Sequence, residues 1–170
     1  MAATTPVIYA VSNVILRSAR TSDPVNVAAI DPGSYQQVAP VTDLQFTSGD
    51  AAGELGSLEK DPTAVLVSEE MAAFLKAEVG DTLYALLVRA TNAQTEVKLH
   101  ITGTYERLPG FPEGADAVMS IAEHTAAVPS KSPDFFLARP PAATTPPCSA
   151  RSPRCAKAPA ASTTSRSTPA

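Results

Sequence analysis

The 170-residue sequence contains no tryptophan, 5% aromatic residues, two histidines and two cysteines. This shortage of histidine and cysteine limits the metal sites and nucleophilic catalytic sites that the chain can build. The best candidate for an apolar span, Val7–Leu16, is interrupted by Ser12 and Asn13, and a membrane-spanning helix needs about 20 apolar residues. No basic segment precedes it, as a secretory signal would require. The sequence therefore predicts neither a membrane span nor a secretory signal.

Acidic residues are absent after Asp134, and this absence divides the chain into two parts. Residues 1–138 contain all seventeen acidic residues and eight basic ones, a net charge of −9, whereas residues 139–170 contain five basic residues and no acidic one. The second part also holds seven of the sixteen prolines and both cysteines, Cys148 and Cys155. We therefore expect a domain over 1–138 and a disordered Pro/Ala/Ser/Thr-rich tail over 139–170. The net charge of −4 for the whole chain gives no general attraction to nucleic acid.

Short strand patterns and short helix patterns follow one another along residues 1–138, which predicts an α+β fold. We expect a twisted mixed or antiparallel sheet with two or three short helices. The first two strands are expected to form a hairpin, because the turn residues Thr21–Pro24 separate them. Strands are expected over Pro6–Ala19, Val25–Ile30, Ala64–Val67, Thr82–Arg89, Glu96–Tyr105, Ala117–Ser120 and Phe135–Leu137.

Capping residues mark where two of the expected helices begin. Asp50 precedes a helix over Ala51–Lys60, and Ser68 precedes a helix that we expect to run to Ala77. The apolar stripe of the second helix, expected to pack on the sheet, is Met71, Phe74 and Leu75. Further helical segments are expected over Ser34–Val38, Asp43–Phe46 and Ile121–Val128.

The strand Glu96–Tyr105 alternates between apolar and polar residues and follows a hairpin tip expected at Asn92. Alternation of period two places successive side chains on opposite faces of a sheet. The expected buried face carries Val97, Leu99 and Ile101, and the expected exposed face carries Lys98, His100 and Thr102.

Residues that could carry chemistry are few and scattered. His100 and His124 have no partner at metal-ligand or catalytic spacing, so we expect both on the solvated surface. Glu69 and Glu70 are expected at a helix N-terminus, where the helix dipole favours acids. The sequence therefore predicts no enzyme, no catalytic residue, no cofactor and no metal site. A hydrolase would require a polar pocket around one of the two histidines.

One loop, Arg107–Asp116 (RLPGFPEGAD), is stiffened by two prolines. A stiff loop loses little conformational entropy when it binds a partner. The residues expected to make such a partner contact are Arg107, Leu108, Phe111 and Glu113. The alternative is that Phe111 folds back into the domain.

The run AVLVSEEMAAFLKAEVGDTLYALLV, followed by a strand and by ITGTYERLPGFPEGAD, resembles the extracytoplasmic domain of FtsX/MacB-like ABC transporter permeases. The shared pattern is a short apolar strand, an acidic-capped helix that ends in a hydrophobic-Gly-Asp turn, and a hairpin leading to a V/I-x-G-x-Y/F strand. The segments PVIYAVSNV and VAAIDPGSYQQVAP resemble actinobacterial-type members of the family. The resemblance covers about residues 5–138.

The resemblance implies a non-catalytic domain on the extracytoplasmic face of the cell membrane, flanked by membrane helices. Such a domain couples ATP-driven movement of those helices to an external substrate, protein or lipid. The implied partners are the permease transmembrane helices and an ATP-binding-cassette subunit. This chain would be a fragment, inactive in transport alone. No cofactor and no single functional residue follows from the resemblance. The alternative is a free-standing soluble α+β domain that binds a small ligand or a protein.

The tail has the character of a shifted reading frame. In the frame that starts at the third base of each preceding codon, the first two bases of every Cys codon and most Ser codons complete a codon for an apolar residue. In the same frame, every Thr codon gives Asp, Asn, His or Tyr. The first Cys and Ser positions of the tail, 148, 149, 152 and 155, then have the spacing of an amphipathic helix. The alternative is a natural Pro/Ala/Ser/Thr linker.

Overall fold

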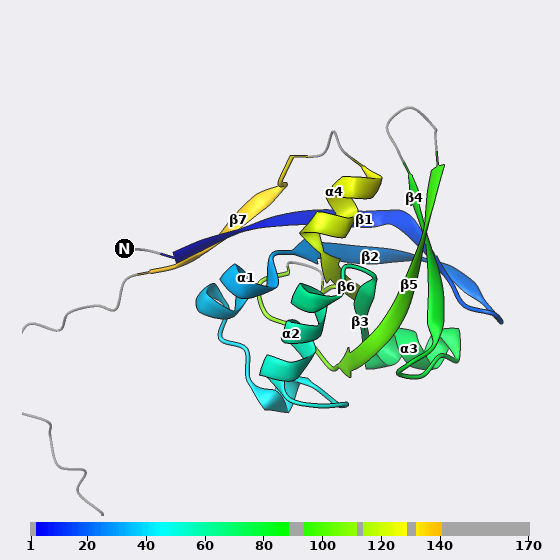
Figure 1. The fold of residues 1–170 in the computed structure, drawn as a ribbon, viewed down its shortest axis with the longest axis horizontal. Coiled ribbons are helices and arrows are strands. Elements are labelled where there is room, and N and C mark those ends of the chain that lie inside the picture. Colours follow the sequence, from blue (N-terminus) through cyan, green and yellow to red (C-terminus); the bar gives the residue numbers. More distant parts are fainter. Residues whose placement is uncertain (1–2, 89–93, 112–113, 129–131, 141–170) are drawn as a thin grey trace, which may run out of the picture.

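Seven strands and four α-helices make up residues 3–88, 94–111, 114–128 and 132–140, which are the residues described by the computed structural model (Figure 1). The strands are β1 (Ala3–Arg17), β2 (Ser22–Ile30), β3 (Ala64–Ser68), β4 (Thr82–Val88), β5 (Gln94–Tyr105), β6 (Ala117–Ser120) and β7 (Phe135–Arg139). The helices are α1 (Pro32–Val38), α2 (Ala51–Lys60), α3 (Glu69–Leu75) and α4 (Ile121–Ala127), with one 3-10 turn, η1 (Asp43–Gln45).

Six of the strands form a closed barrel in the order β2-β6-β3-β5-β4-β1, and the antiparallel pairing of β1 with β2 completes the ring. The pairs β2–β6 and β3–β5 are parallel and the others are antiparallel. The predicted α+β class with a mixed sheet is confirmed, and so is the β1–β2 hairpin. Two details differ from the expectation: the sheet closes on itself, and the described residues contain four α-helices rather than two or three.

Strand β7 lies outside the ring and pairs antiparallel with the first residues of β1, from Ala3 opposite Arg139 to Val7 opposite Phe135. Asp134 fixes its start, because a carboxylate oxygen of Asp134 accepts a hydrogen bond from the Tyr9 backbone N–H at 2.7 Å. Both ends of the described domain therefore lie together, opposite the tip of the β1–β2 hairpin (Figure 1). The expected tail begins inside β7 at residue 139, and its residues 141–170 lie outside the described part of the chain.

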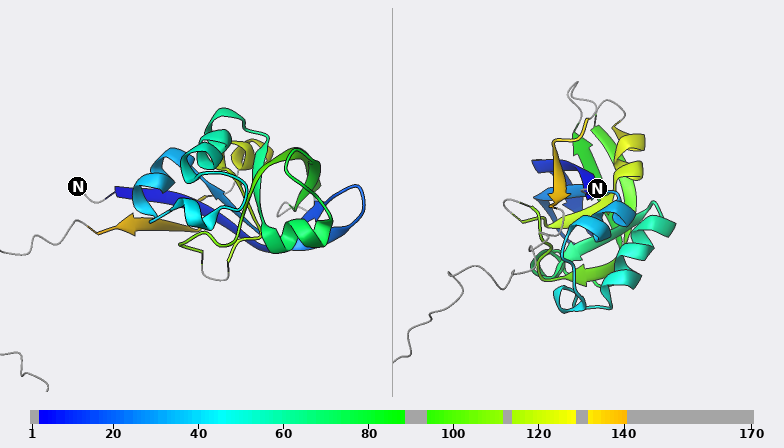
Figure 2. Two further views of the ribbon diagram at one scale, coloured as in Figure 1. Left: turned by 90° about the horizontal axis from the view of Figure 1, so that it is seen from below. Right: turned by 90° about the vertical axis from the view of Figure 1, so that its left-hand side faces the viewer.

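Two hydrophobic clusters lie on the two faces of the barrel wall. The interior cluster includes Val65, Val67 and Leu99, whereas the outer cluster includes Leu66 and Tyr105. Alternate residues of β3 thus face opposite clusters, which explains why every residue of that strand is buried. Helices α1 and α2 lie next to each other over the outer cluster (Figure 2).

Local capping signals place the helices as expected. The Asp50 carboxylate accepts a hydrogen bond from the Gly53 N–H at 2.8 Å, and the Ser68 hydroxyl accepts one from the Met71 N–H at 3.2 Å. Helix α3 ends at Leu75, two residues before the expected end, because Lys76 adopts a left-handed conformation with φ of 52°.

Two expectations about exposure are wrong. Phe74 is 52% exposed, since the buried face of α3 is formed by Met71, Ala72 and Leu75. His124 is only 3% exposed, because it shares the inward face of α4 with Ala127. The hairpin tip expected at Asn92 lies outside the described residues.

Candidate functional site

The loop between β5 and β6 is held in place by three tyrosine hydroxyls. Tyr35 donates a hydrogen bond to the carbonyl of Pro109 at 2.6 Å, and Tyr105 donates one to the carbonyl of Ala115 at 2.7 Å. Tyr9 donates a third to the carbonyl of Gly114. These carbonyls lie in a segment without helix or strand bonds of its own, so the tyrosines satisfy groups that would otherwise be costly to bury.

Phe111 anchors the same loop by stacking between two of these tyrosines. Its ring is nearly parallel to Tyr9 at 6.2 Å and to Tyr35 at 5.9 Å between centroids. Phe111 is 6% exposed and Leu108 is 3% exposed, so both side chains belong to the outer cluster. Of the four residues expected to contact a partner, Arg107 is exposed, and Glu113 lies outside the described residues.

Burial keeps the hydroxyls of Tyr35 and Tyr105 protonated. Loss of solvation raises the pKa of Tyr35 well above its ordinary value. Burial also raises the pKa of Tyr105, and the nearby negative charge of Asp116 adds to the rise. The hydroxyls of Tyr35 and Tyr105 therefore remain hydrogen-bond donors over the whole physiological pH range.

A surface groove of about 380 Å³ lies between this loop and η1. Its walls include Leu44, which is 91% exposed, and the loop residues Arg107 and Pro109. On its other side, Arg107 also lines a cavity of about 250 Å³ with Glu70 and other residues. Glu106, also exposed, lines the same two hollows beside Arg107.

A buried carboxylate under α2 was not anticipated from the sequence. Glu54 is 7% exposed and accepts a hydrogen bond from the Ser48 hydroxyl at 3.1 Å. Burial raises the pKa of Glu54; the Ser48 hydrogen bond opposes this rise, and the negative charge of Asp50 adds to it. The only local signal was Gly103 inside a strand, since a glycine there often marks the close approach of another group.

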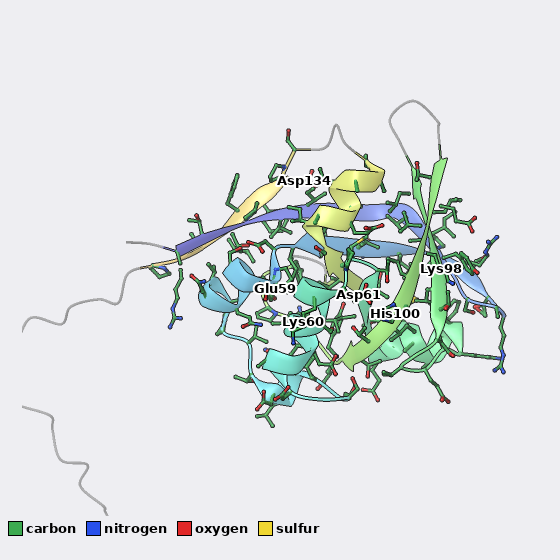
Figure 3. All side chains as sticks on the ribbon, in the orientation of Figure 1. Glu59, Lys60, Asp61, Lys98, His100 and Asp134 are labelled. Atoms are coloured by element: carbon green, nitrogen blue, oxygen red, sulfur yellow. The ribbon has the colours of Figure 1, made fainter. Side chains whose placement is uncertain are left out.

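The structure gives His100 two partners from the turn between α2 and β3 (Figure 3). Its Nε2 lies 3.4 Å from a carboxylate oxygen of Asp61, and its Nδ1 lies 3.2 Å from the Thr63 hydroxyl. Thr63 donates its hydroxyl proton to Asp61 at 2.8 Å. His100, Asp61 and Thr63 thus contact one another in a single polar cluster at this turn.

Other candidates for chemistry remain separate from this cluster. Glu69 and Glu70 are exposed in the first turn of α3. Within the described ranges, no three or more His, Cys, Asp and Glu side chains converge as a set of metal ligands. Cys148 and Cys155 lie outside those ranges.

Comparison with known proteins identifies the fold. No family model and no curated protein matches the sequence. The fold is that of the extracellular domain of the noncanonic ABC-type transporter YknZ from Gram-positive bacteria, with a TM-score of 0.55 and 10% sequence identity over 82% of this chain. The predicted resemblance to an extracytoplasmic permease domain is therefore confirmed at the level of the fold. The match covers 65% of the YknZ domain, less than two thirds of its length.

A second solved structure, a domain assigned to a permease protein of Porphyromonas gingivalis, aligns over 84% of this chain and 56% of its own length. Its identity is 20% and its TM-score is 0.48, which is too low to support a further argument.

Proposed function

We propose that this chain is the non-catalytic extracytoplasmic domain of an FtsX/MacB-like ABC transporter permease. In this role it couples ATP-driven movement of membrane helices to an external substrate or partner. Its partners are the permease transmembrane helices, an ATP-binding-cassette subunit and an external protein or lipid. The parent permease lies in the cell membrane with this domain outside. Alone, the chain is inactive in transport.

The observation that carries this proposal is the pairing of β1 with β7. Ala3 lies opposite Arg139, so the two ends of the described domain leave the barrel side by side. A domain inserted between two neighbouring membrane helices needs this arrangement, since both connections must reach the same membrane surface. The fold shared with the YknZ domain supports the same role. In the described ranges, no helix has the length and apolar character to cross a bilayer.

The loop clamped by the three tyrosines supports a contact with an external partner. Arg107 is exposed and borders both neighbouring hollows, so we propose it as the charged part of that contact. Leu108 and Phe111 are buried in the outer cluster, so they would affect the contact indirectly, through the position of the loop.

Sequencing the DNA on both sides of the coding region tests the proposal directly. We expect apolar segments of about 20 residues on both sides of the domain, with the downstream one in a frame reached by a single-base shift inside the tail. A gene for an ATP-binding-cassette protein is expected next to it. A sound frame without such segments would contradict the proposal and favour a free-standing α+β binding domain.

A functional test follows once the intact permease is assembled. Replacing residues 3–139 by a short linker should abolish substrate transport while ATP hydrolysis by the reconstituted transporter continues. Unchanged transport after the replacement would show that the domain does not couple ATP hydrolysis to transport.

A further inference from the structure

Basic residues gather around one exposed tyrosine at the end of the barrel away from the chain ends. Tyr84 is 36% exposed, and the Arg17 guanidinium lies 5.4 Å from its ring centroid. Lys98 is its direct neighbour across the β4–β5 pair. Arg20 and Lys76 line a cleft together with Tyr84. Four of the seven basic residues that the structure describes thus surround Tyr84, although residues 1–138 carry a net charge of −9.

The cleft beside Tyr84 has a volume of about 370 Å³ and lies between the β1–β2 hairpin tip and the end of α3. One wall is fixed to the other by Ser18, whose hydroxyl donates a hydrogen bond to the carbonyl of Leu75 at 2.8 Å. The same hydroxyl oxygen accepts hydrogen bonds from the backbone N–H groups of Arg20 and Thr21, each at 3.1 Å. The cleft is therefore formed before any ligand enters, which lowers the entropic cost of binding.

A second, more apolar cavity of about 190 Å³ adjoins the cleft and shares Tyr84 with it. Its walls include Ile15 and Leu86, which lie opposite each other on β1 and β4. Both side chains are half-buried. A ligand that fills both hollows must therefore carry a charged group next to an apolar one.

Two acids line these hollows, Asp81 in the cleft and Glu96 in the second cavity, and each has a partner in the protein. Glu96 forms a salt bridge with Arg17 at 3.2 Å, and Asp81 accepts a hydrogen bond from the backbone N–H of Glu78 at 2.9 Å. In contrast, Arg20, Lys76 and Lys98 form no salt bridge with any residue in the described part of the chain. Three cations are thus available to an incoming anion.

We propose that this surface, formed by Arg20, Lys76, Tyr84, Lys98 and the adjoining Ile15–Leu86 cavity, binds an acidic peptide segment of a partner protein. A carboxylate of the peptide enters the cationic cleft, where hydrogen bonds to charged donors are stronger than neutral ones. A neighbouring apolar side chain enters the second cavity. An inorganic anion would leave that cavity empty, so a peptide fits the two hollows better. The inference stands on this surface alone and does not require the permease role.

Fluorescence anisotropy with a fluorescein-labelled octapeptide of alternating glutamate and leucine tests the proposal on the full chain. We expect saturable binding that weakens as salt is raised, and at least tenfold weaker binding for Lys76→Glu. Lys60→Glu is the matched control, because Lys60 is also an exposed lysine at the end of a helix but lies on α2, away from the site (Figure 3). This control should keep the original affinity.

Arg20→Glu repeats the test from the other wall of the cleft, and Tyr84→Ala tests the shared wall. Each variant is compared at equal helix content and melting temperature. Equal loss of affinity in Lys60→Glu would overturn the proposal, because net charge alone would then explain binding. Equal binding of an alternating lysine–leucine peptide would also overturn it. So would binding of inorganic phosphate or of vesicles with anionic lipid in place of the peptide.

Discussion

The carboxylate of Glu54 occupies the space beside the Cα of Gly103, so that a Cβ at residue 103 would overlap it. Glu54 comes from α2 and Gly103 from β5, and their contact fixes how closely the helix packs on the barrel. The β3–β5 register shifts between Val65 and Leu66, opposite Ile101 and Gly103. This bulge brings Gly103 to face α2, whereas Ile101 belongs to the interior cluster.

Replacing Gly103 by alanine should destabilise the protein by about 1–3 kcal/mol, because the added methyl group overpacks a buried contact. Urea unfolding measures the change. Gly56→Ala is the matched control, since Gly56 is inside α2 with nothing within 4 Å of its added Cβ. It should stabilise the helix by about 0.5–1 kcal/mol. Equal effects of both substitutions would contradict the role assigned to the Glu54–Gly103 contact.

Glu54→Gln should change how stability depends on pH. Burial raises the pKa of Glu54 in the folded protein, so the folded state binds a proton more tightly than the unfolded state. The contribution of Glu54 to stability therefore falls as pH rises from its ordinary pKa of about 4.3 through the raised value. Glutamine cannot ionise. The melting temperature of Glu54→Gln relative to the original protein should thus increase with pH between 4 and 8, and parallel curves would contradict this.

Phe111→Ala should cost about 3–5 kcal/mol, as expected for loss of a buried aromatic side chain. The stacking of Phe111 between Tyr9 and Tyr35 is lost, and the loop carbonyls lose their fixed positions. Phe74→Ala is the control, because Phe74 is 52% exposed and its loss should change stability by no more than about 0.5 kcal/mol. Denaturant unfolding of both variants measures these changes in stability. A loss of stability for Phe111→Ala as small as that for Phe74→Ala would show that the Phe111 ring lies outside the core.

Asp61→Asn should lower stability at neutral pH but not in acid. Hydrogen bonds from the Thr63 hydroxyl and backbone N–H lower the pKa of Asp61, and nearby His100 adds to this effect. The ionised form is therefore favoured in the folded state, and its contribution is complete above the ordinary pKa of about 3.9. The difference in melting temperature between the two proteins should close as pH falls below about 4. A difference that stays constant down to pH 2 would show that the ionisation is irrelevant.

The elements that sequence patterns predicted well are those determined by neighbouring residues. The Asp50 cap precedes α2 and the Ser68 cap precedes α3, as expected, because a capping side chain bonds to backbone groups two or three residues away. The alternation in β5 also predicted correctly that Val97, Leu99 and Ile101 are buried together, up to the bulge that follows Ile101. The bulge itself depends on the partner strand β3 and on Glu54, and Gly103 is its one mark in the local pattern.

Closure of the barrel and the candidate site depend on distant pairs. Residues of β1 from Val14 to Arg17 pair with both β2 and β4, and hydrophobic alternation cannot distinguish such a ring from an open sheet. Likewise, Tyr35 meets the carbonyl of Pro109 across 74 residues of sequence. The exposure of Phe74 and the burial of His124 were mispredicted for a related reason: a one-residue rotation of a seven-residue helix decides which side chain faces the barrel.

The pairing of β1 with β7 also has a mechanical consequence. Because Ala3 and Arg139 lie at the same end of an antiparallel pair, pulling them apart loads the outermost hydrogen bonds first and unzips β7 one bond at a time. The six-stranded ring does not include β7, so it would stay intact while this strap is released. β1 continues from this end to the hairpin tip, with an irregular register against β2 between Ala10 and Val14. Opposed forces on the two ends should therefore release β7 before they disturb the ring.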